Sequence, residues 1–153
     1  QREYARKLMA HWLEGGGGRY NPCRKEALET VRVVAELQDA LAEINTFWGT
    51  GAKTVATGAS QRENCISHAQ LRKIIFEHSR KLPYIIIFGT GWGLSEKIVQ
   101  QTDHILEPII GAGEYNHLSV RSASAITLDR LLRREAAPGN ADDSGVSSCF
   151  KQE

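Results

Sequence analysis

Residues 83–96 read PYIIIFGTGWGLSE, and this stretch decides the fold class. Tyr84 to Phe88 is an apolar run, typical of a strand that is buried on both faces of a parallel sheet. Gly89, Gly91 and Gly93 follow at two-residue spacing, and Ser95 begins a predicted helix. Glycines between a strand and a helix lie where α/β sheets bind ligands, at the carboxyl ends of the strands. Two interpretations stay open: a ligand site, or a tight turn with glycines at positive φ.

The same alternation of strand and helix extends in both directions from this stretch. An amphipathic helix over 4–13 stops at four glycines, and Asn21 with Pro22 begins a short second helix. We then predict strands at 30–34, 52–58, 84–88 and 104–110, and helices at 35–48, 67–81, 94–101 and 119–134. Such alternation predicts an α/β fold with a parallel sheet. The domain is expected to span 1–134, and the small, polar tail 135–153 is expected to be disordered.

Composition excludes several classes of protein. A chain of 153 residues with 41% apolar residues fits one globular domain, and its net charge of +1 gives no overall field for nucleic-acid binding. Three cysteines without a CxxC pair indicate neither a zinc site nor a disulfide framework, and no metal is expected. No apolar run approaches the ~20 residues of a membrane span, and no signal-peptide pattern begins the chain, so a cytoplasmic protein is expected.

Common phosphate-binding motifs do not fit the glycine stretch. A dinucleotide fingerprint requires a third glycine at the position of Leu94, and an acidic residue at the end of a following strand. Glu107 is the nearest candidate for that acidic residue, but Pro108 follows it. The sequence also has no GK[ST]. A ligand without a pyrophosphate is therefore favoured.

A second informative stretch, residues 106–126, reads LEPIIGAGEYNHLSVRSASAI. A glycine loop with polar residues is followed by a helix whose small side chains allow a close approach. In this order and spacing, FGTGWGL and YNHLSVRSA are similar to the hallmarks of a bacterial family of S-adenosylmethionine-dependent RNA methyltransferases in the SPOUT, or α/β-knot, class. The resemblance covers residues 1–132.

The resemblance implies a SPOUT-like parallel sheet with helices on both faces and a C-terminal trefoil knot, an exception to the rule that connections do not thread loops. It implies bound S-adenosylmethionine, a homodimer and an RNA substrate, either tRNA or rRNA. Members of that family begin with a strand, a helix and a strand before the region that matches Gln1, so this segment is expected to be missing from the sequence as given. The implied cofactor-binding residues are Thr57, Gly58, Ala59, Phe88, Gly89, Thr90, Gly91, Gly93, Ile109, Gly111, Leu118, Ser119 and Ser122.

Alternating glycines suit that cofactor, because backbone groups then reach an adenine and a ribose with no β-carbon between them. Trp92 either covers this loop or packs in the interior. Asn116 and Glu114 are candidates for orienting or deprotonating a base, and Arg121 for holding a phosphate. The opposing interpretations are that Asn116 caps the loop, that Glu114 is solvated and that Arg121 bridges to a second subunit.

The same loop contains two further candidates. His117 is either a base or a structural histidine, and Tyr115 either stacks on a nucleobase or packs. For RNA binding we expect a local basic patch, the opposing interpretation being a solvated helix face. Its candidates are Arg62, Arg72, Lys73, Arg80 and Lys81.

Two functions from different classes stay open. The first is methylation of RNA, and the alternative is a non-catalytic knot module that binds RNA or a nucleotide-like ligand. A small-molecule α/β enzyme is disfavoured by the resemblance. For the dimer, apolar residues around the last helix predict the interface, near Ile126, Leu128, Leu131 and Leu132.

Overall fold

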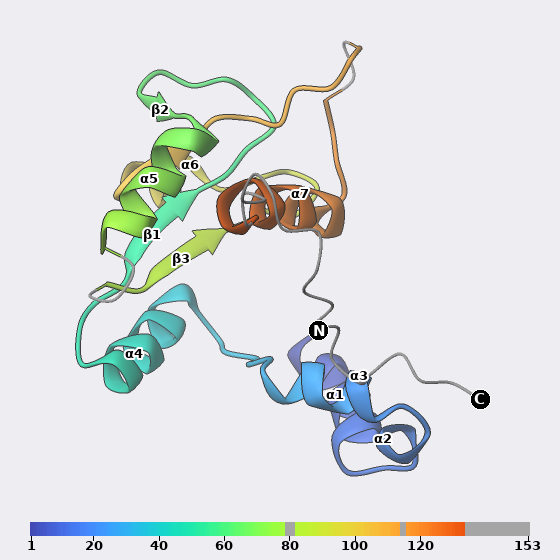
Figure 1. Cartoon of the computed structure of the whole chain (residues 1–153). Coiled ribbons are helices and arrows are strands. Elements are labelled where there is room, and N and C mark those ends of the chain that lie inside the picture. The colour runs from blue at the N-terminus through green and yellow to red at the C-terminus, as the bar shows by residue number, and fades with distance from the viewer. Residues whose placement is uncertain (79–81, 114–115, 134–153) are drawn as a thin grey trace, which may run out of the picture. The chain divides into compact units, whose positions relative to one another are not determined.

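The structure, a computed structural model, describes residues 1–78, 82–113 and 116–133, which fall into two compact units (Figure 1). One unit contains residues 1–40. The other contains residues 41–133, with the sheet. Each is described by itself.

Residues 1–40 form helices α1 (Arg2–Leu13), α2 (Gly17–Tyr20) and α3 (Pro22–Glu29). The Asn21 cap is confirmed, because its side-chain oxygen accepts a hydrogen bond from Arg24 N at 2.9 Å. The Arg24 guanidinium lies 4.5 Å from the ring centroid of Trp12, which ties α3 to α1. A β-carbon on Gly18 would lie 2.4 Å from the carbonyl oxygen of Trp12, so the glycine run permits this close return of the chain.

The strand predicted at 30–34 is wrong. These residues are a turn and irregular backbone, and helix α4 (Leu37–Trp48) follows. A β-branched run forms a strand only where a neighbouring strand supplies hydrogen bonds, and no sheet includes this segment. The apolar face predicted for α4 is half-buried at Leu37, Leu41 and Ile44, but Phe47 is 83% exposed.

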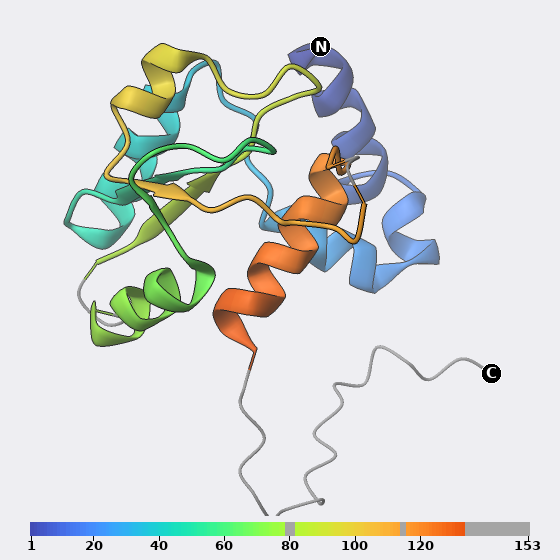
Figure 2. The same ribbon diagram turned by 90° about the horizontal axis from the view of Figure 1, so that it is seen from above.

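The other unit contains a sheet of four parallel strands in the order β2-β4-β1-β3. These strands are β1 (Lys53–Ala56), β2 (Cys65–Ile66), β3 (Tyr84–Ile87) and β4 (His104–Leu106). The parallel α/β sheet is thus confirmed, while β2, with only two residues, was not predicted. Helices α5 (His68–His78) and α7 (Val120–Leu132) lie on one face, and α6 (Glu96–Gln100) lies on the other (Figure 2).

The centre of this unit is a small apolar core between the sheet and the pair α5 and α7. It consists of Val55, Leu71, Leu106 and Leu131. The Arg72 guanidinium of α5 donates to the carbonyl oxygen of Leu131 at 2.7 Å and so joins the two helices. Leu131 is fully buried and therefore belongs to this core, which corrects its assignment to an exposed interface.

Hydrogen bonds also fix the amino-terminal ends of the neighbouring strands β1 and β4. Asp103 accepts from Lys53 Nζ at 2.7 Å and from the Thr54 backbone and hydroxyl, each at 2.8 Å. Desolvation alone would raise its pKa, but the hydrogen bonds from Lys53 and Thr54 lower the pKa of Asp103 to about 2. The start of β4 is therefore attached to the start of β1 by an ionised carboxylate.

One further expectation needs correction. Strand β3 is an edge strand whose four residues are half-buried, so it is not buried on both faces. Cys65 is a free thiol. Among the helices of the described residues, none has the length and apolarity needed to cross a membrane.

Candidate functional site

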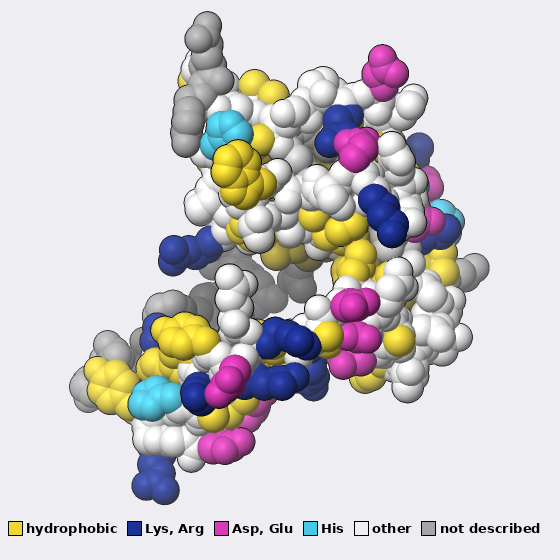
Figure 3. Space-filling view, turned by 180° about the vertical axis from the view of Figure 1, so that it is seen from behind, with side chains coloured by type: hydrophobic (Ala, Val, Ile, Leu, Met, Phe, Trp, Pro, Cys, Tyr) yellow, Lys and Arg dark blue, Asp and Glu magenta, His cyan; other side chains and the backbone are white. Residues whose placement is uncertain are grey.

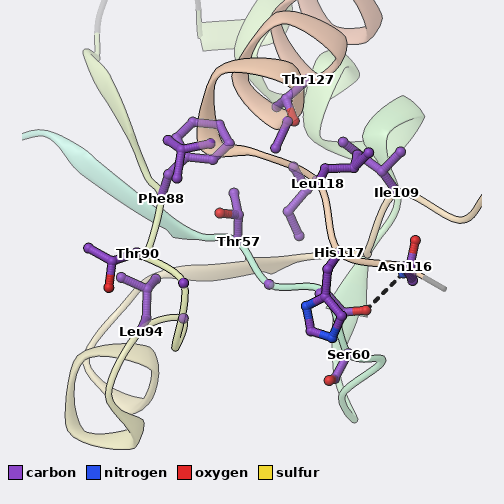
Figure 4. A pocket seen from close by; sticks show the side chains of 18 of the residues that line it. Thr57, Ser60, Phe88, Thr90, Leu94, Ile109, Asn116, His117, Leu118 and Thr127 are labelled. Carbon is purple, nitrogen blue, oxygen red and sulfur yellow. Dashed lines mark hydrogen bonds between the residues drawn. The ribbon is translucent and has the colours of Figure 1, made fainter.

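The loops after β1, β3 and β4 meet beside the first turn of α7 and enclose a pocket of about 490 Å³ (Figure 4). This position follows from the parallel sheet, since all carboxyl ends of its strands open at one edge. The inner wall is apolar and buried at Val99 and Leu106, with Thr127 of α7 beside them. The outer wall is made of loop residues from 57–60, 88–94 and 116–119, in which glycines and small side chains stand beside the larger Phe88, Trp92 and His117.

The structure brings together most of the residues that the sequence suggested for a cofactor. The pocket is lined by Thr57, Gly58, Ala59, Phe88, Gly89, Thr90, Gly91, Gly93, Ile109, Leu118 and Ser119. Gly111 and Ser122 are not among the lining residues. Ser122 instead donates its backbone N–H to the Ser119 hydroxyl oxygen at 3.1 Å, which caps α7 as predicted.

The three glycines of the second loop have different roles. Gly93 has φ +77° and donates its N–H to the Thr90 carbonyl oxygen at 2.8 Å, closing a tight turn. A β-carbon on Gly89 would lie 2.2 Å from the carbonyl carbon of Gly93. Gly91 has open space around it, and its φ is outside the left-handed region. The interpretation of a tight turn with positive φ therefore holds for Gly93, whereas Gly89 is required by its close approach to Gly93. The fold leaves Gly91 unexplained.

Trp92 occupies the tip of this turn. Trp92 is among the residues that line the pocket and is 100% exposed, so of its two interpretations the one of packing in the interior is wrong. No described residue of the protein covers the indole ring.

Hydrogen bonds hold the three loops to one another. Thr57 donates both its N–H and its hydroxyl to the Ile87 carbonyl oxygen, at 3.1 and 2.9 Å, which fixes the first loop to the end of β3. Asn116 donates its side-chain amide to the Ala59 carbonyl oxygen at 2.9 Å and ties the third loop to the first (Figure 4). Asn116 is therefore part of the pocket wall, in agreement with the loop-capping interpretation.

Two charged side chains of the described lining are held by partners. Arg62 forms an ion pair with Glu96 at 2.7 Å. Glu107 accepts from the backbone N–H and the ring Nδ1 of His68, at 2.8 and 2.9 Å. The backbone hydrogen bond, followed by the ring hydrogen bond, lowers the pKa of Glu107, so the carboxylate is ionised at neutral pH. It connects the end of β4 to the first turn of α5.

The suggested catalytic residues are not all in one place. Asn116 and His117 line the pocket, while Arg121 is exposed and is not among the lining residues. Glu114 and Tyr115 lie outside the described residues. Sequence reasoning missed Glu107 and Thr127 as parts of the site. Glu107 was considered only for a dinucleotide fingerprint, and Thr127 had no signal beyond its place on an otherwise apolar helix face.

The basic residues suggested for RNA binding do not form a free patch in the described part of the chain. Arg72 is bonded to Leu131 and lies 4.8 Å from the ring centroid of Phe76. Lys73 is exposed beside Glu77 at 3.9 Å, and Arg80 and Lys81 lie outside the described residues. On the face shown in Figure 3, the Lys and Arg side chains of the sheet-containing unit stand singly among acidic and apolar ones.

The described residues contain no group of three or more His, Cys, Asp or Glu side chains placed to hold a metal ion.

Comparison with known proteins gives a family match over residues 1–133, to a family described as SAM-dependent RNA methyltransferase. An uncharacterized protein of Aquifex aeolicus is 38% identical over 134 residues, which cover 88% of this chain and 64% of that protein. A tRNA (guanine-N(1)-)-methyltransferase of Nitratidesulfovibrio vulgaris is 38% identical over 132 residues, covering 86% of this chain and 30% of that protein. A protein of the same name from Oleidesulfovibrio alaskensis is 36% identical, with the same coverage. The chain thus spans less than two thirds of the length of each of these relatives.

Proposed function

The chain belongs to the family of SAM-dependent RNA methyltransferases, and from this membership we propose that it transfers a methyl group from S-adenosylmethionine to a nucleotide of RNA. The observation that supports this most directly is the pocket at the carboxyl ends of β1, β3 and β4. Three loops that are far apart in the sequence build it, and the first two line it with the glycines Gly58, Gly89, Gly91 and Gly93. Its volume of about 490 Å³ is in the range of small-molecule and cofactor sites.

The residues present fit S-adenosylmethionine. The buried apolar side chains of Val99 and Leu106 suit a purine ring. The backbone around Gly58 and Gly91 offers hydrogen-bond donors and acceptors to the polar edges of that ring. The proposed cofactor-binding residues are the eleven predicted ones that line the pocket, namely Thr57, Gly58, Ala59, Phe88, Gly89, Thr90, Gly91, Gly93, Ile109, Leu118 and Ser119. Gly111 and Ser122 remain candidates outside the lining. When bound, the cofactor supplies an activated methyl group on a sulfonium sulfur.

The chain's own residues then have to position an acceptor and remove its proton. The acceptor nitrogen or oxygen would have to be placed in line with the activated methyl group of a bound cofactor, and it would have to give up its proton to a residue of the chain. Asn116 holds the wall of the pocket in place through Ala59, and in our proposal it also orients the acceptor. Glu114 is proposed for proton removal and Arg121 for a phosphate of the RNA.

The finer architecture follows the family resemblance. We propose that residues 1–134 act as one SPOUT-like methyltransferase domain, supported by a family match that covers both compact units. The proposal includes a C-terminal trefoil knot in which the last strand and helix thread through an earlier loop. It also includes a cytoplasmic location and a homodimer whose interface includes exposed apolar residues of α7. Exposure of Leu128 and Leu132, at 46% and 54%, supports the dimer.

Calorimetry and methyl transfer test the function. The full-length protein should bind S-adenosylmethionine and S-adenosylhomocysteine, and it should incorporate label from methyl-labelled S-adenosylmethionine into RNA. Unfractionated tRNA is the first substrate to use, because two relatives are named as tRNA methyltransferases, and purified rRNA is the second. Binding of neither ligand would contradict the proposal. Binding of ligand and RNA without incorporation would favour the non-catalytic module.

A further inference from the structure

Trp92 has a place in the structure that the fold does not require. It lies at the tip of the turn Thr90–Gly93, is 100% exposed and lines the pocket rim. An indole is among the side chains with the most apolar surface to bury, so full exposure leaves a large free area beside the site. Trp48 is exposed to 53% and has Phe47 against it at a centroid distance of 6.0 Å, so the two exposed tryptophans differ.

The turn holds Trp92 outward by backbone geometry. The hydrogen bond from Gly93 N to the Thr90 carbonyl oxygen closes the turn, and the contact between Gly89 and Gly93 leaves no room for a β-carbon. These constraints fix the base of the turn, so the ring is presented in a restricted set of positions. Glycine on each side of Trp92 also leaves both faces of the indole free of neighbouring side chains.

The position of the ring indicates its ligand. A residue that packed over the cofactor would already be partly covered by the pocket walls, whereas the indole of Trp92 has no such cover. The rim is also where a methyl acceptor must enter, since reacting atoms have to come within ~3.5 Å of each other. An RNA base that leaves its stack to enter a site loses stacking, and an aromatic side chain replaces it, because every base has a π-face.

We propose that Trp92 is the stacking platform for the nucleobase that is methylated. The inference rests on the proposed function and deepens it: Trp92 is a substrate-positioning residue, with a planar base of RNA as its ligand. The cofactor and a second copy of this chain are the competing occupants of the ring, and the test separates them from RNA.

The experiment compares the full-length wild type with Trp92→Phe, Trp92→Leu and Trp48→Leu. Phenylalanine keeps a π-face, leucine keeps apolar surface without one, and Trp48 lies on α4, outside the pocket lining. Dissociation constants are measured for unfractionated tRNA and for rRNA by filter binding, and for S-adenosylhomocysteine by calorimetry. Quenching of tryptophan emission by RNA is followed in each variant.

We expect Trp92→Leu to weaken binding of at least one of the two RNAs roughly tenfold or more, with Trp92→Phe staying within about threefold of wild type. Trp48→Leu should bind RNA like wild type. Affinity for S-adenosylhomocysteine should be the same in all four proteins. Quenching by RNA should be retained in Trp48→Leu and lost in Trp92→Leu.

Four results would overturn the stacking role. They are unchanged RNA affinity in Trp92→Leu, an equal loss of S-adenosylhomocysteine affinity in that variant, a change in its oligomeric state by sedimentation, and a wild type that binds the cofactor product but neither RNA. The first three leave the proposed function standing if the wild type still incorporates methyl groups. If the wild type bound no cofactor, the proposed function itself would be contradicted.

Discussion

At the scale of single residues, the glycines of the second loop give a matched pair of substitutions. Gly89→Ala should displace the loop, because its β-carbon would lie 2.2 Å from backbone of Gly93. Gly91→Val should leave the fold intact, since Gly91 has open space and an unstrained φ, yet it should abolish cofactor binding by blocking close approach of the ligand. Thermal unfolding and calorimetry with S-adenosylhomocysteine measure the two effects separately.

Of the two causes that the sequence suggests for an effect at Gly91, close approach of a ligand and a positive φ, only the first remains. Among the glycines of this loop only Gly93 has positive φ. If Gly91→Val kept the wild-type dissociation constant, the loop would be a turn without a ligand. Gly58→Ala, at another open lining position, is a milder control that should reduce affinity less.

Asp103 predicts how stability depends on pH. Its pKa is lowered from the ordinary value of 3.8 to about 2, so its contribution to the free energy of unfolding is present above pH ~4 and is lost as the pH falls toward 2. With the side chain 31% exposed, we discount the full shift to about 1–2 kcal/mol. Asp103→Asn should therefore be less stable than wild type by this amount at pH 7, and the two should converge near pH 2.

Urea unfolding at several pH values checks this prediction. A constant difference between the two proteins from pH 7 to pH 2 would mean that Asp103 acts through packing rather than charge. Glu107→Gln is a useful comparison, because the pKa of Glu107 is also lowered, but by hydrogen bonds from His68 instead of Lys53.

Residue roles were predictable from the sequence only where the cause is local. The spacing of Gly89, Gly91 and Gly93 marks a loop, but which of them has no room for a β-carbon depends on where Gly93 returns. Glu107 lies within the strand predicted at 104–110, yet its role in the pocket wall depends on His68, 39 residues away in the sequence. No local pattern indicates such a partner.

At the scale of elements, helix α5 gives two adjacent basic residues different roles, because Arg72 contacts α7 and Lys73 faces solvent. Arg72 bonds α7 through Leu131, so Arg72→Ala should lower the free energy of unfolding by about 1–2 kcal/mol. The melting temperature should then fall by roughly 2–8 °C. Lys73 is exposed, so Lys73→Ala should leave the melting temperature unchanged and, if it contacts a phosphate, lower the salt slope of RNA binding by about one unit.

Filter binding of structured RNA at several salt concentrations, with thermal unfolding of each variant, measures both effects. Arg80→Ala belongs in the same series, as a candidate outside the described residues. If neither Lys73→Ala nor Arg80→Ala altered the slope, the phosphate contacts would lie elsewhere on the protein. Cofactor affinity should be unchanged in both, and for Lys73 the reason is that it is not among the lining residues of the pocket.

The sequence predicted the starts of helices correctly, but it failed where strand pairing in the sheet decides whether a segment is a strand. The caps at Asn21 and Ser119 are confirmed, and Ser67 and Gln70 form a reciprocal pair at the start of α5. Each cap involves residues within three positions, so the sequence contains its cause. Strand β2 and the irregular segment at 30–34 were both missed, because a strand exists only through a neighbour distant in the sequence.

At the scale of the whole molecule, the alternation of strands and helices predicted the parallel sheet, but no pattern specified the order β2-β4-β1-β3. That order places the ends of β1, β3 and β4 together and so makes one pocket from three loops. Whether copies of the chain associate depends on the residues that this packing leaves exposed. Leu128 and Leu132 are one helical turn apart on α7 and are about half exposed, while Leu131 between them is buried.

The double substitution Leu128→Asp with Leu132→Asp should therefore convert a homodimer into a monomer without unfolding it, because neither side chain belongs to the core cluster. Two carboxylates would have to lose their water in an apolar interface, which is strongly unfavourable. Sedimentation velocity at micromolar concentration measures the state, and circular dichroism checks the fold. Val31→Asp, an apolar-to-acidic change at an exposed residue outside α7, should leave the dimer intact. A monomeric wild type would remove the dimer from the proposal, and a dimeric double variant would move its interface away from these two leucines.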